Sequence, residues 1–183
     1  MSNKSKKGFT IIEVVLVLAI AGLIFLMVFI ALPALQRSQR NTQRADDLSR
    51  LLTAVNSYQS NNKGKLPYRA GADNKPSFHD PNFIKRYVDS GCSAGTGGTG
   101  TQTFGDTCGD QFRDPDGVEY KVTYLGHQMG TSDVNDKSFD HEFLVITYAT
   151  CGDEGIALKG TGDRQVAIYF VMEGGAISCN DNH

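Results

Sequence analysis

Residues 14–35 form a run of 22 positions without a charged side chain, and this run restricts the possible folds more than any other feature. At 1.5 Å per residue, a helix of that length spans about 33 Å, which matches the roughly 30 Å hydrocarbon core of a bilayer. An ordinary secretory signal fits less well, because its apolar region is shorter and ends at a cleavage site of small residues. The run therefore predicts a membrane-spanning helix near the N-terminus.

The helical pattern continues beyond the apolar run to about residue 60. No Gly or Pro interrupts residues 34–63, and apolar residues recur there at steps of three and four. The expected apolar face consists of Ala45, Leu48, Leu52, Val55 and Tyr58. The polar residues expected off this face are Arg44, Asp47, Arg50 and Asn56. This second half is amphipathic and suited to pack on a folded domain, and we expect Gly64 to terminate the helix.

The remaining residues, 63–183, have the composition of a soluble domain. β-Branched and aromatic residues predict strands at 118–125, 142–149 and 165–173, and Gly174-Gly175 predicts a hairpin turn into a short strand at 176–179. We expect a short helix at 82–89 and an irregular loop at 91–109, which is rich in Gly, Thr and Ser. The expected fold class is α+β, with the long helix packed against a small antiparallel sheet.

Four cysteines, all in the second half of the chain, predict two disulfide bonds in an exported domain. They are Cys92, Cys108, Cys151 and Cys179. Among the three possible pairings we favour Cys92–Cys108 and Cys151–Cys179, because each closes a loop between neighbouring segments. Basic residues flank the apolar run on both sides, so charge gives weak evidence on orientation. The cysteines favour an oxidising location for the C-terminal domain, outside the cytoplasm.

The string Lys-Lys-Gly-Phe-Thr-Ile-Ile-Glu, residues 6–13, follows a short basic leader and directly precedes the apolar run. In this placement the chain resembles type IV prepilins and pseudopilins. Their class III signal has a basic leader ending in Gly, an aromatic or methylatable first mature residue, and a Glu five positions into the mature chain. The matching residues are Gly8, Phe9 and Glu13. The resemblance covers residue 1 to about residue 35.

The resemblance implies that a membrane prepilin peptidase cuts between Gly8 and Phe9 and methylates the Phe9 amine. It also implies that Glu13 pairs with the Phe9 amine of a neighbouring subunit during assembly. The alternative for Glu13 is a solvated position at the level of the lipid headgroups, because a carboxylate is costly to bury without a partner.

Gly22 and Pro33 allow two interpretations. They are either a small residue and a helix kink of the kind that membrane helices tolerate, or they mark a segment that loses helicity in a filament, as in many pilins. Pro33 lies three residues beyond the usual proline position of the family, which corresponds here to Ile30. We therefore expect any such melted segment to be shifted or absent.

The expected organisation has four parts. Residues 1–8 are a leader peptide, 9–35 a transmembrane and filament-core helix, 36–62 an amphipathic helix continuing into the head, and 63–183 a globular head domain. The resemblance implies a single-pass precursor in the inner (cytoplasmic) membrane with its head outside, and an extracellular filament after assembly. The implied partners are other pilin subunits, mainly identical copies, together with the prepilin peptidase, an assembly platform and its motor.

The sequence gives no support for an enzyme, a cofactor, a metal site or a nucleic-acid binder. It contains no phosphate-binding loop and no nucleophile elbow. Without the leader, 15 basic and 20 acidic side chains give a charge of −5, which argues against general nucleic-acid binding. The string Asp-Pro-Asp-Gly at 114–117 predicts a turn rather than a calcium loop. Other weak candidates for ligands are His79, His127, His141, His183, Asp133, Asp136, Asp140 and Glu142.

The function expected from these features is that of a structural subunit of a type IV pilus, serving adhesion, twitching motility or DNA uptake. One alternative is a pseudopilin of a type II secretion system, with the same anchor but a short periplasmic assembly. A third possibility, from another class, is a single-pass anchored ectodomain that binds a ligand and never polymerises.

Overall fold

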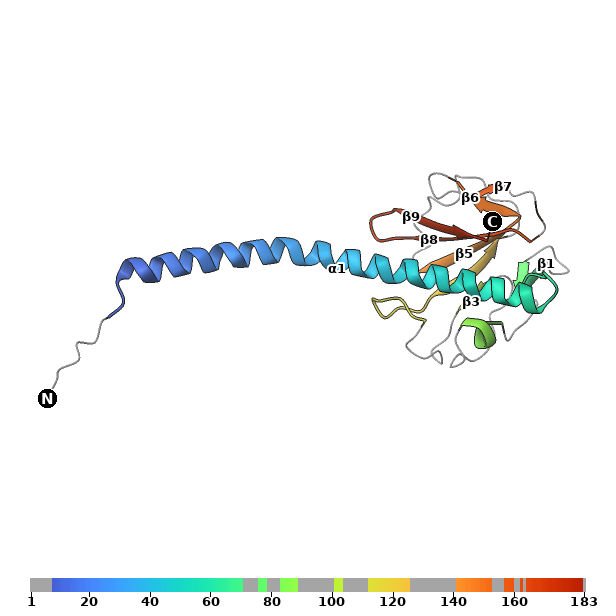
Figure 1. Cartoon of the computed structure of the whole chain (residues 1–183), viewed down its shortest axis with the longest axis horizontal. Coiled ribbons are helices and arrows are strands. Elements are labelled where there is room, and N and C mark those ends of the chain that lie inside the picture. The colour runs from blue at the N-terminus through green and yellow to red at the C-terminus, as the bar shows by residue number, and fades with distance from the viewer. Residues whose placement is uncertain are drawn as a thin grey trace. The chain divides into compact units, whose positions relative to one another are not determined.

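A computed structural model of the chain describes residues 8–70, 76–78, 83–88, 101–103, 112–125, 141–152, 157–159, 162 and 164–182. The chain divides into two compact units, Met1–Gln39 and Arg40–His183. The first contains the N-terminal part of the long helix. The second, which we call the head, contains the rest of that helix and all the described strands (Figure 1).

The elements follow one another in a simple order. They are α1 (Ile11–Asn61), β1 (Tyr68–Ala70), β2 (Pro76–Phe78), a short π-helical turn η1 (Ile84–Val88), β3 (Thr101–Thr103), β4 (Lys121–Leu125), β5 (Glu142–Thr147), β6 (Ala149–Cys151), β7 (Ala157–Lys159), β8 (Val166–Val171) and β9 (Ile177–Asp181). The predicted short helix at 82–89 corresponds to η1. Within the predicted irregular loop 91–109, residues 101–103 instead form β3.

The helix α1 ends close to the predicted glycine. Lys63 and Gly64 both have left-handed backbone conformations, with φ angles of 57° and 79°. The Gly64 N–H donates to the Gln59 carbonyl oxygen at 2.7 Å, a bond that satisfies one of the carbonyl groups left over at a helix end. Two left-handed residues in succession turn the chain sharply away from the helix axis.

The central sheet has the strand order β3-β4-β5-β8-β9. Strands β4 and β5 are parallel, with Lys121 opposite Glu142, whereas the other neighbouring pairs are antiparallel. The expectation of a purely antiparallel sheet is therefore wrong. A parallel pair needs a crossover of about a dozen residues or more, and residues 126–140 between the two strands are long enough to provide one.

The predicted strand 142–149 is divided in two. Tyr148 has a φ angle of 55°, which interrupts the extended backbone between β5 and β6. As a result β5 stays in the central sheet, while β6 pairs with β7 in a separate two-stranded sheet. The turn between β8 and β9 is as predicted, because Gly174 and Gly175 adopt φ angles of 94° and 84° and connect two antiparallel strands.

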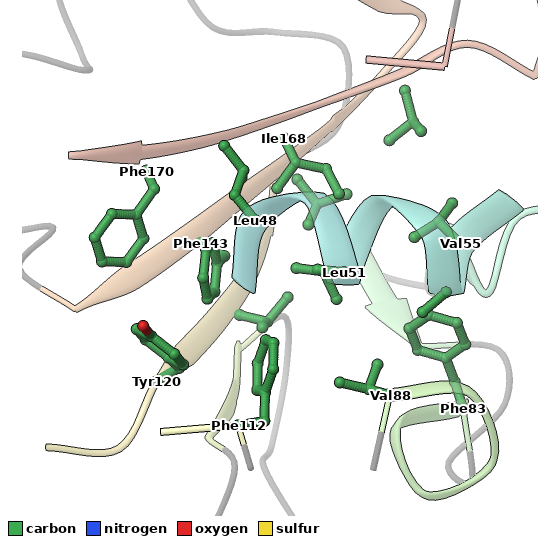
Figure 2. Close-up of a cluster of buried hydrophobic side chains, with 14 of the residues drawn as sticks. Leu48, Leu51, Val55, Phe83, Val88, Phe112, Tyr120, Phe143, Ile168 and Phe170 are labelled. Atoms are coloured by element: carbon green, nitrogen blue, oxygen red, sulfur yellow. The ribbon is translucent and has the colours of Figure 1, made fainter. Parts of the chain in front are cut away.

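The core of the head lies between α1 and one face of the central sheet. Leu48 and Leu51 point from the helix toward an aromatic group on the sheet side, and Val55 belongs to the same core (Figure 2). That group consists of Phe112, Tyr120, Phe143 and Phe170, whose neighbouring ring centroids lie 4.7–5.7 Å apart. Each such buried side chain stabilises the fold by about 1.5–3 kcal/mol, and the edge and tilted ring contacts add to this.

The opposite face of the sheet is buried as well. Leu144, Ile146, Ala167 and Tyr169 alternate with the residues that face the helix and form a second apolar cluster. The disulfide Cys151–Cys179 joins β6 to β9 beside this cluster, with a Cα–Cα distance of 5.9 Å. This pairing is the one that we favoured. It is one disulfide among the described residues rather than two, because Cys92 and Cys108 lie outside them.

Candidate functional site

Gly8 and Phe9, the residues at the expected cleavage site, precede the first turn of α1. The Phe9 side chain is 90% exposed, and a Cβ placed on Gly8 would meet no atom within 4 Å. The peptide bond between them is therefore open to an enzyme that must surround the backbone. The rest of the predicted leader, residues 1–7, lies outside the described residues.

Glu13 closes a capping box at the start of α1. The Thr10 backbone N–H and hydroxyl donate to Glu13 Oε2 at 2.9 and 3.0 Å, and the Glu13 N–H donates to the Thr10 hydroxyl at 3.4 Å. This reciprocal pair satisfies N–H groups that a helix leaves unpaired at its N-terminus. The signal Thr-x-x-Glu is present in the sequence, but we considered Glu13 only as an assembly residue.

The capping box brings the Glu13 carboxylate close to the expected new N-terminus. Its Oε2 atom binds the amide of Thr10, the residue directly after Phe9. In the described part of the chain, Oε1 of the same carboxylate has no hydrogen-bond or ion-pair partner. One oxygen therefore orders the helix start, and the other stays available to a positively charged group.

The apolar half of α1 is exposed throughout. Its large apolar side chains from Phe9 to Leu35 range from 42% to 90% exposed. By length and composition α1 contains a segment able to cross a membrane. The helix is continuous through Gly22 and Pro33, so it contains no melted segment at these positions. The expected kink at Pro33 stays a prediction.

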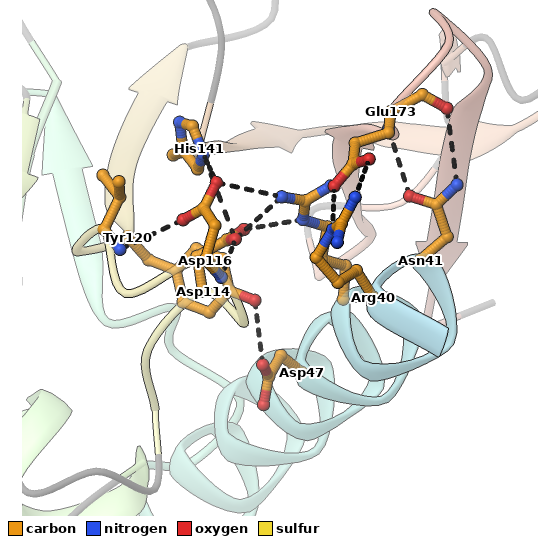
Figure 3. A network of polar contacts seen from close by, with 10 residues as sticks. Arg40, Asn41, Asp47, Asp114, Asp116, Tyr120, His141 and Glu173 are labelled. Carbon is orange, nitrogen blue, oxygen red and sulfur yellow. Dashed lines mark hydrogen bonds and ion pairs between the residues drawn. The ribbon is translucent and has the colours of Figure 1, made fainter. Parts of the chain in front are cut away.

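A second candidate site joins α1 to two turns of the head through charged side chains. We call it the arginine network, and its members are Arg40, Asn41, Arg44, Asp47, Asp114, Asp116, Tyr120, His141 and Glu173 (Figure 3).

Arg44 lies at the centre of the arginine network. It is only 3% exposed, and its guanidinium donates to both oxygens of Asp114 at 2.6 and 2.7 Å and to Glu173 at 2.9 Å. The hydrogen bond with Asp114 raises the pKa of Arg44 above its usual value. Such a paired and fully hydrogen-bonded arrangement is what allows a charged side chain to be buried.

The turn between β8 and β9 is held to α1 by Glu173. Arg40 binds its carboxylate with two hydrogen bonds, at 2.6 and 2.8 Å. The Asn41 side chain accepts from the Glu173 N–H at 3.1 Å and donates to its carbonyl oxygen at 3.3 Å. The hydrogen bonds from Arg40 lower the pKa of Glu173 to about 2.

Residues 114–117 form the predicted turn, closed by a bond of 2.8 Å from the Gly117 N–H to the Asp114 carbonyl oxygen. The carboxylate of Asp116 lies 2.6 Å from His141 Nε2. Partial burial raises the pKa of Asp116, but the hydrogen bonds from His141 and from the Val118 N–H outweigh this effect and lower it to about 2. Beside this turn, the Tyr120 hydroxyl donates to Asp47 at 2.9 Å. Burial, followed by the effect of Asp47, raises the pKa of Tyr120.

Asp114, Asp116 and His141 each place a potential metal-ligand atom within 4.8 Å of the others. Both oxygens of Asp114, however, already accept from the Arg44 guanidinium, whose positive charge would repel a cation. The trio therefore serves the ion pairs of the arginine network. Other weak ligand candidates, namely His79, His127, His183, Asp133, Asp136 and Asp140, lie outside the described residues, and Glu142 begins β5.

Sequence reasoning missed the arginine network because Arg44 was expected off the apolar face. The buried face of α1 instead consists of Arg44, Leu48, Leu51, Ala54, Val55 and Tyr58, while Ala45 and Leu52 are only partly buried. The steps of four and three residues from Arg44 to Leu48, Leu51 and Val55 could have revealed its position. A buried arginine then requires a carboxylate, and the acidic turn at 114–117 supplies it.

Comparisons with known proteins bear on the N-terminal segment alone. Residues 3–29 match the family profile described as the prokaryotic N-terminal methylation motif. The matched range includes Gly8, Phe9, Glu13 and Gly22, and it ends before Pro33. Comparison with curated proteins and with solved structures gave no match.

Proposed function

We propose that this chain, which carries the class III prepilin signal of type IV pilins and pseudopilins, is a filament subunit that polymerises through α1. The observation that carries the proposal is the direct junction of this signal to a continuous helix with exposed apolar residues on every side. Such a surface needs lipid or other helices around it. Prepilin peptidase would cut after Gly8 and methylate Phe9, and the head would stay outside the membrane.

Assembly replaces lipid around the apolar half of α1 with the helices of sister subunits. Burial from water is worth about 25 cal/mol per Å² of apolar surface, but lipid tails are as apolar as leucine. The exchange therefore gains little from the hydrophobic effect. Close packing and polar contacts must supply the affinity and the register between subunits.

Glu13 is suited to set this register. Cleavage creates a positively charged amine on Phe9, and Glu13 Oε1 is available to bind it in a neighbouring subunit. In apolar surroundings an unpaired carboxylate costs several kcal/mol, so the subunit is driven toward the position in which the pair forms. An uncleaved precursor has no such amine, which makes processing a precondition for assembly.

The finer assignment within this proposal is a type IV pilus subunit. The pseudopilin of a type II secretion system shares the signal and the helix. Two observations on cells distinguish them. Long surface filaments that contain this chain favour a pilus, and a secretion defect on loss of the chain, without filaments, favours a pseudopilin.

The experiment that tests polymerisation compares Glu13→Gln with the wild type in cells that contain prepilin peptidase. Glutamine can replace glutamate in a capping box, so this variant keeps the cap of α1 and removes the charge alone. Asp46→Asn is the matched control, because Asp46 is an exposed acid on the same helix within the head. Processing is followed by mass, and assembly by the amount of subunit in sheared filaments.

We expect Glu13→Gln to be cleaved normally but to reduce the assembled subunit at least tenfold, while Asp46→Asn assembles like the wild type. Normal assembly of Glu13→Gln would refute the role of the charge. If cells with this variant keep every function that is lost when the chain is deleted, although no assembled subunit is found, the result would instead support a non-polymerising anchored ectodomain.

A further inference from the structure

A polar groove lies in the head where α1 ends, on residues that the proposed filament core does not use. It is a broad, open groove of about 740 Å³. Its lining consists of Asn56, Gln59, Ser60, Lys63, Gly64, Arg164, Gln165 and Asn182. Apart from the glycine, every lining side chain is polar, and none is acidic. These side chains suit a polar ligand better than an apolar one.

Side-chain amides fix one wall of the groove. Asn182 donates to Gln59 Oε1 at 3.1 Å and to the Arg164 carbonyl oxygen at 2.9 Å, and Gln59 donates to the same carbonyl at 2.8 Å. The Val166 N–H in turn donates to Asn182 Oδ1 at 2.8 Å. These bonds tie the end of α1 to the start of β8 and to the end of β9. The wall is therefore ordered before any ligand arrives.

The Arg164 guanidinium lies directly over the backbone of Gly64. A Cβ built on Gly64 would clash with Arg164 Nε and Cζ, so only the absence of a side chain allows this approach. Lys63, in its left-handed conformation, contributes a second exposed cation to the same lining. Within the described residues, neither cationic group has a hydrogen-bond or ion-pair partner.

The two unpaired cations of the groove, Lys63 and Arg164, lie in a head whose net charge is negative. Residues 40–183 contain 14 basic and 19 acidic side chains, a formal charge of −5. An acidic domain that gathers unpaired cations in a concave polar site creates a local attraction for an anion. The Asn56 carboxamide also has no partner among the described residues. The Ser60 hydroxyl donates to the backbone carbonyl oxygen of Asn56, so the hydroxyl oxygen of Ser60 can still accept a hydrogen bond.

We propose that this groove binds an acidic sugar. The Arg164 guanidinium donates two hydrogen bonds to the carboxylate of the sugar, and the Lys63 ammonium group adds a second positive charge near this carboxylate. The Asn56 carboxamide and the Ser60 hydroxyl bind ring hydroxyl groups, which both donate and accept hydrogen bonds. The amide-rich lining favours a sugar over a bare anion, and the absence of apolar lining residues favours it over an acidic peptide. This inference does not depend on polymerisation of the chain.

The test is a titration of the full chain in detergent micelles, followed by saturation-transfer NMR on the ligand. Galacturonate is the probe, and galactose, acetate, inorganic phosphate and a di-aspartate peptide are the comparisons. Arg164→Gln removes one groove cation. Lys65→Gln is the matched control, because Lys65 is an exposed cation two residues from Lys63 that does not line the groove.

We expect saturable binding of galacturonate, at least tenfold weaker binding of each comparison ligand, and at least a tenfold loss in Arg164→Gln. Lys65→Gln should bind like the wild type. Gly64→Ala keeps both charges but displaces the guanidinium, so it should also weaken binding while the head keeps its near-UV circular dichroism spectrum. Equal binding of acetate, phosphate or the peptide would overturn the ligand class. Unchanged affinity in Arg164→Gln would overturn the site.

Discussion

Arg44 is a charged residue buried in the head. Its guanidinium is nearly excluded from solvent and is balanced by Asp114 and Glu173, which come from two different turns. A buried ion pair of this kind adds little net stability compared with apolar residues of the same size, but the loss of one partner leaves the other charge buried alone. The arginine network therefore specifies how the two turns sit on α1 within the head.

Replacement of Arg44 by methionine should lower the free energy of unfolding of the head by about 3–5 kcal/mol, because Asp114 is left buried without a countercharge. Arg40→Met is the control, since Arg40 is 32% exposed and its loss should cost about 1 kcal/mol or less. Urea unfolding of the full chain in detergent, followed by near-UV circular dichroism, measures both. Equal losses in the two variants would contradict the central position of Arg44.

The carboxylates of Glu173 and Asp116 predict acid sensitivity. Their pKa values are about 2 in the folded head, against about 4 in an unfolded chain, so the unfolded chain binds more protons between these values. The stability contributed by these two carboxylates should therefore be constant above about pH 5 and be lost as the pH drops from about 4.5 to 2. Thermal unfolding across this range checks the prediction, and Glu173→Gln should show a shallower fall than the wild type.

At the scale of helices and strands, the head is a helix laid on a mixed sheet whose two faces are both buried. The apolar face of α1 covers one side of β5 and β8, and on the other side their side chains form a second buried cluster with residues of β6. The disulfide Cys151–Cys179 links β6, which belongs to a separate small sheet, to the edge strand β9. This bond therefore connects two sheets that share no strand.

Removal of this disulfide in Cys151→Ala/Cys179→Ala should lower the free energy of unfolding by about 3–4 kcal/mol, as the bond closes a loop with a sequence separation of 28. Non-reducing urea unfolding in detergent compares this variant with the wild type. A loss below about 1 kcal/mol would show that packing of β6 and β7 holds the two sheets together without the bond.

Patterns local to the sequence predicted the elements better than their arrangement. The uncharged run, the amphipathic stripe and the Gly174-Gly175 turn each follow from neighbouring residues, and their elements are present. The parallel pairing of β4 and β5 depends on contacts distant in sequence, which no local pattern encodes. The break at Tyr148 was missed because aromatic residues seldom adopt a left-handed conformation, and nothing in the local sequence marks it.

Prediction of the candidate sites was similarly divided. Gly8, Phe9 and Glu13 were recognised from one contiguous motif, and the family comparison covers all three. The arginine network joins residues from position 40 to position 173, so local spacing could reveal the buried position of Arg44 but not the whole set of its partners. Arg44 was misplaced because a charged residue was assigned to the solvent face, although its spacing from Leu48 and Leu51 places it on the buried one.

Across the whole molecule, the two units differ in how their apolar residues are satisfied. The head buries its apolar side chains in its own core, whereas the large apolar side chains from Phe9 to Leu35 are 42–90% exposed. An apolar helical surface of this kind is stable in lipid or among other helices, and unstable in water. This difference supports the account of a subunit that is stored in a membrane and then assembled.

The central claim, cleavage followed by assembly through α1, is tested most directly by mass spectrometry of the subunit recovered from sheared extracellular filaments. The account predicts a chain that begins at Phe9, carries one added methyl group on its N-terminus and retains the Cys151–Cys179 disulfide. Assembled subunits that still begin at Met1, or a processed chain found only as a soluble monomer, would contradict it.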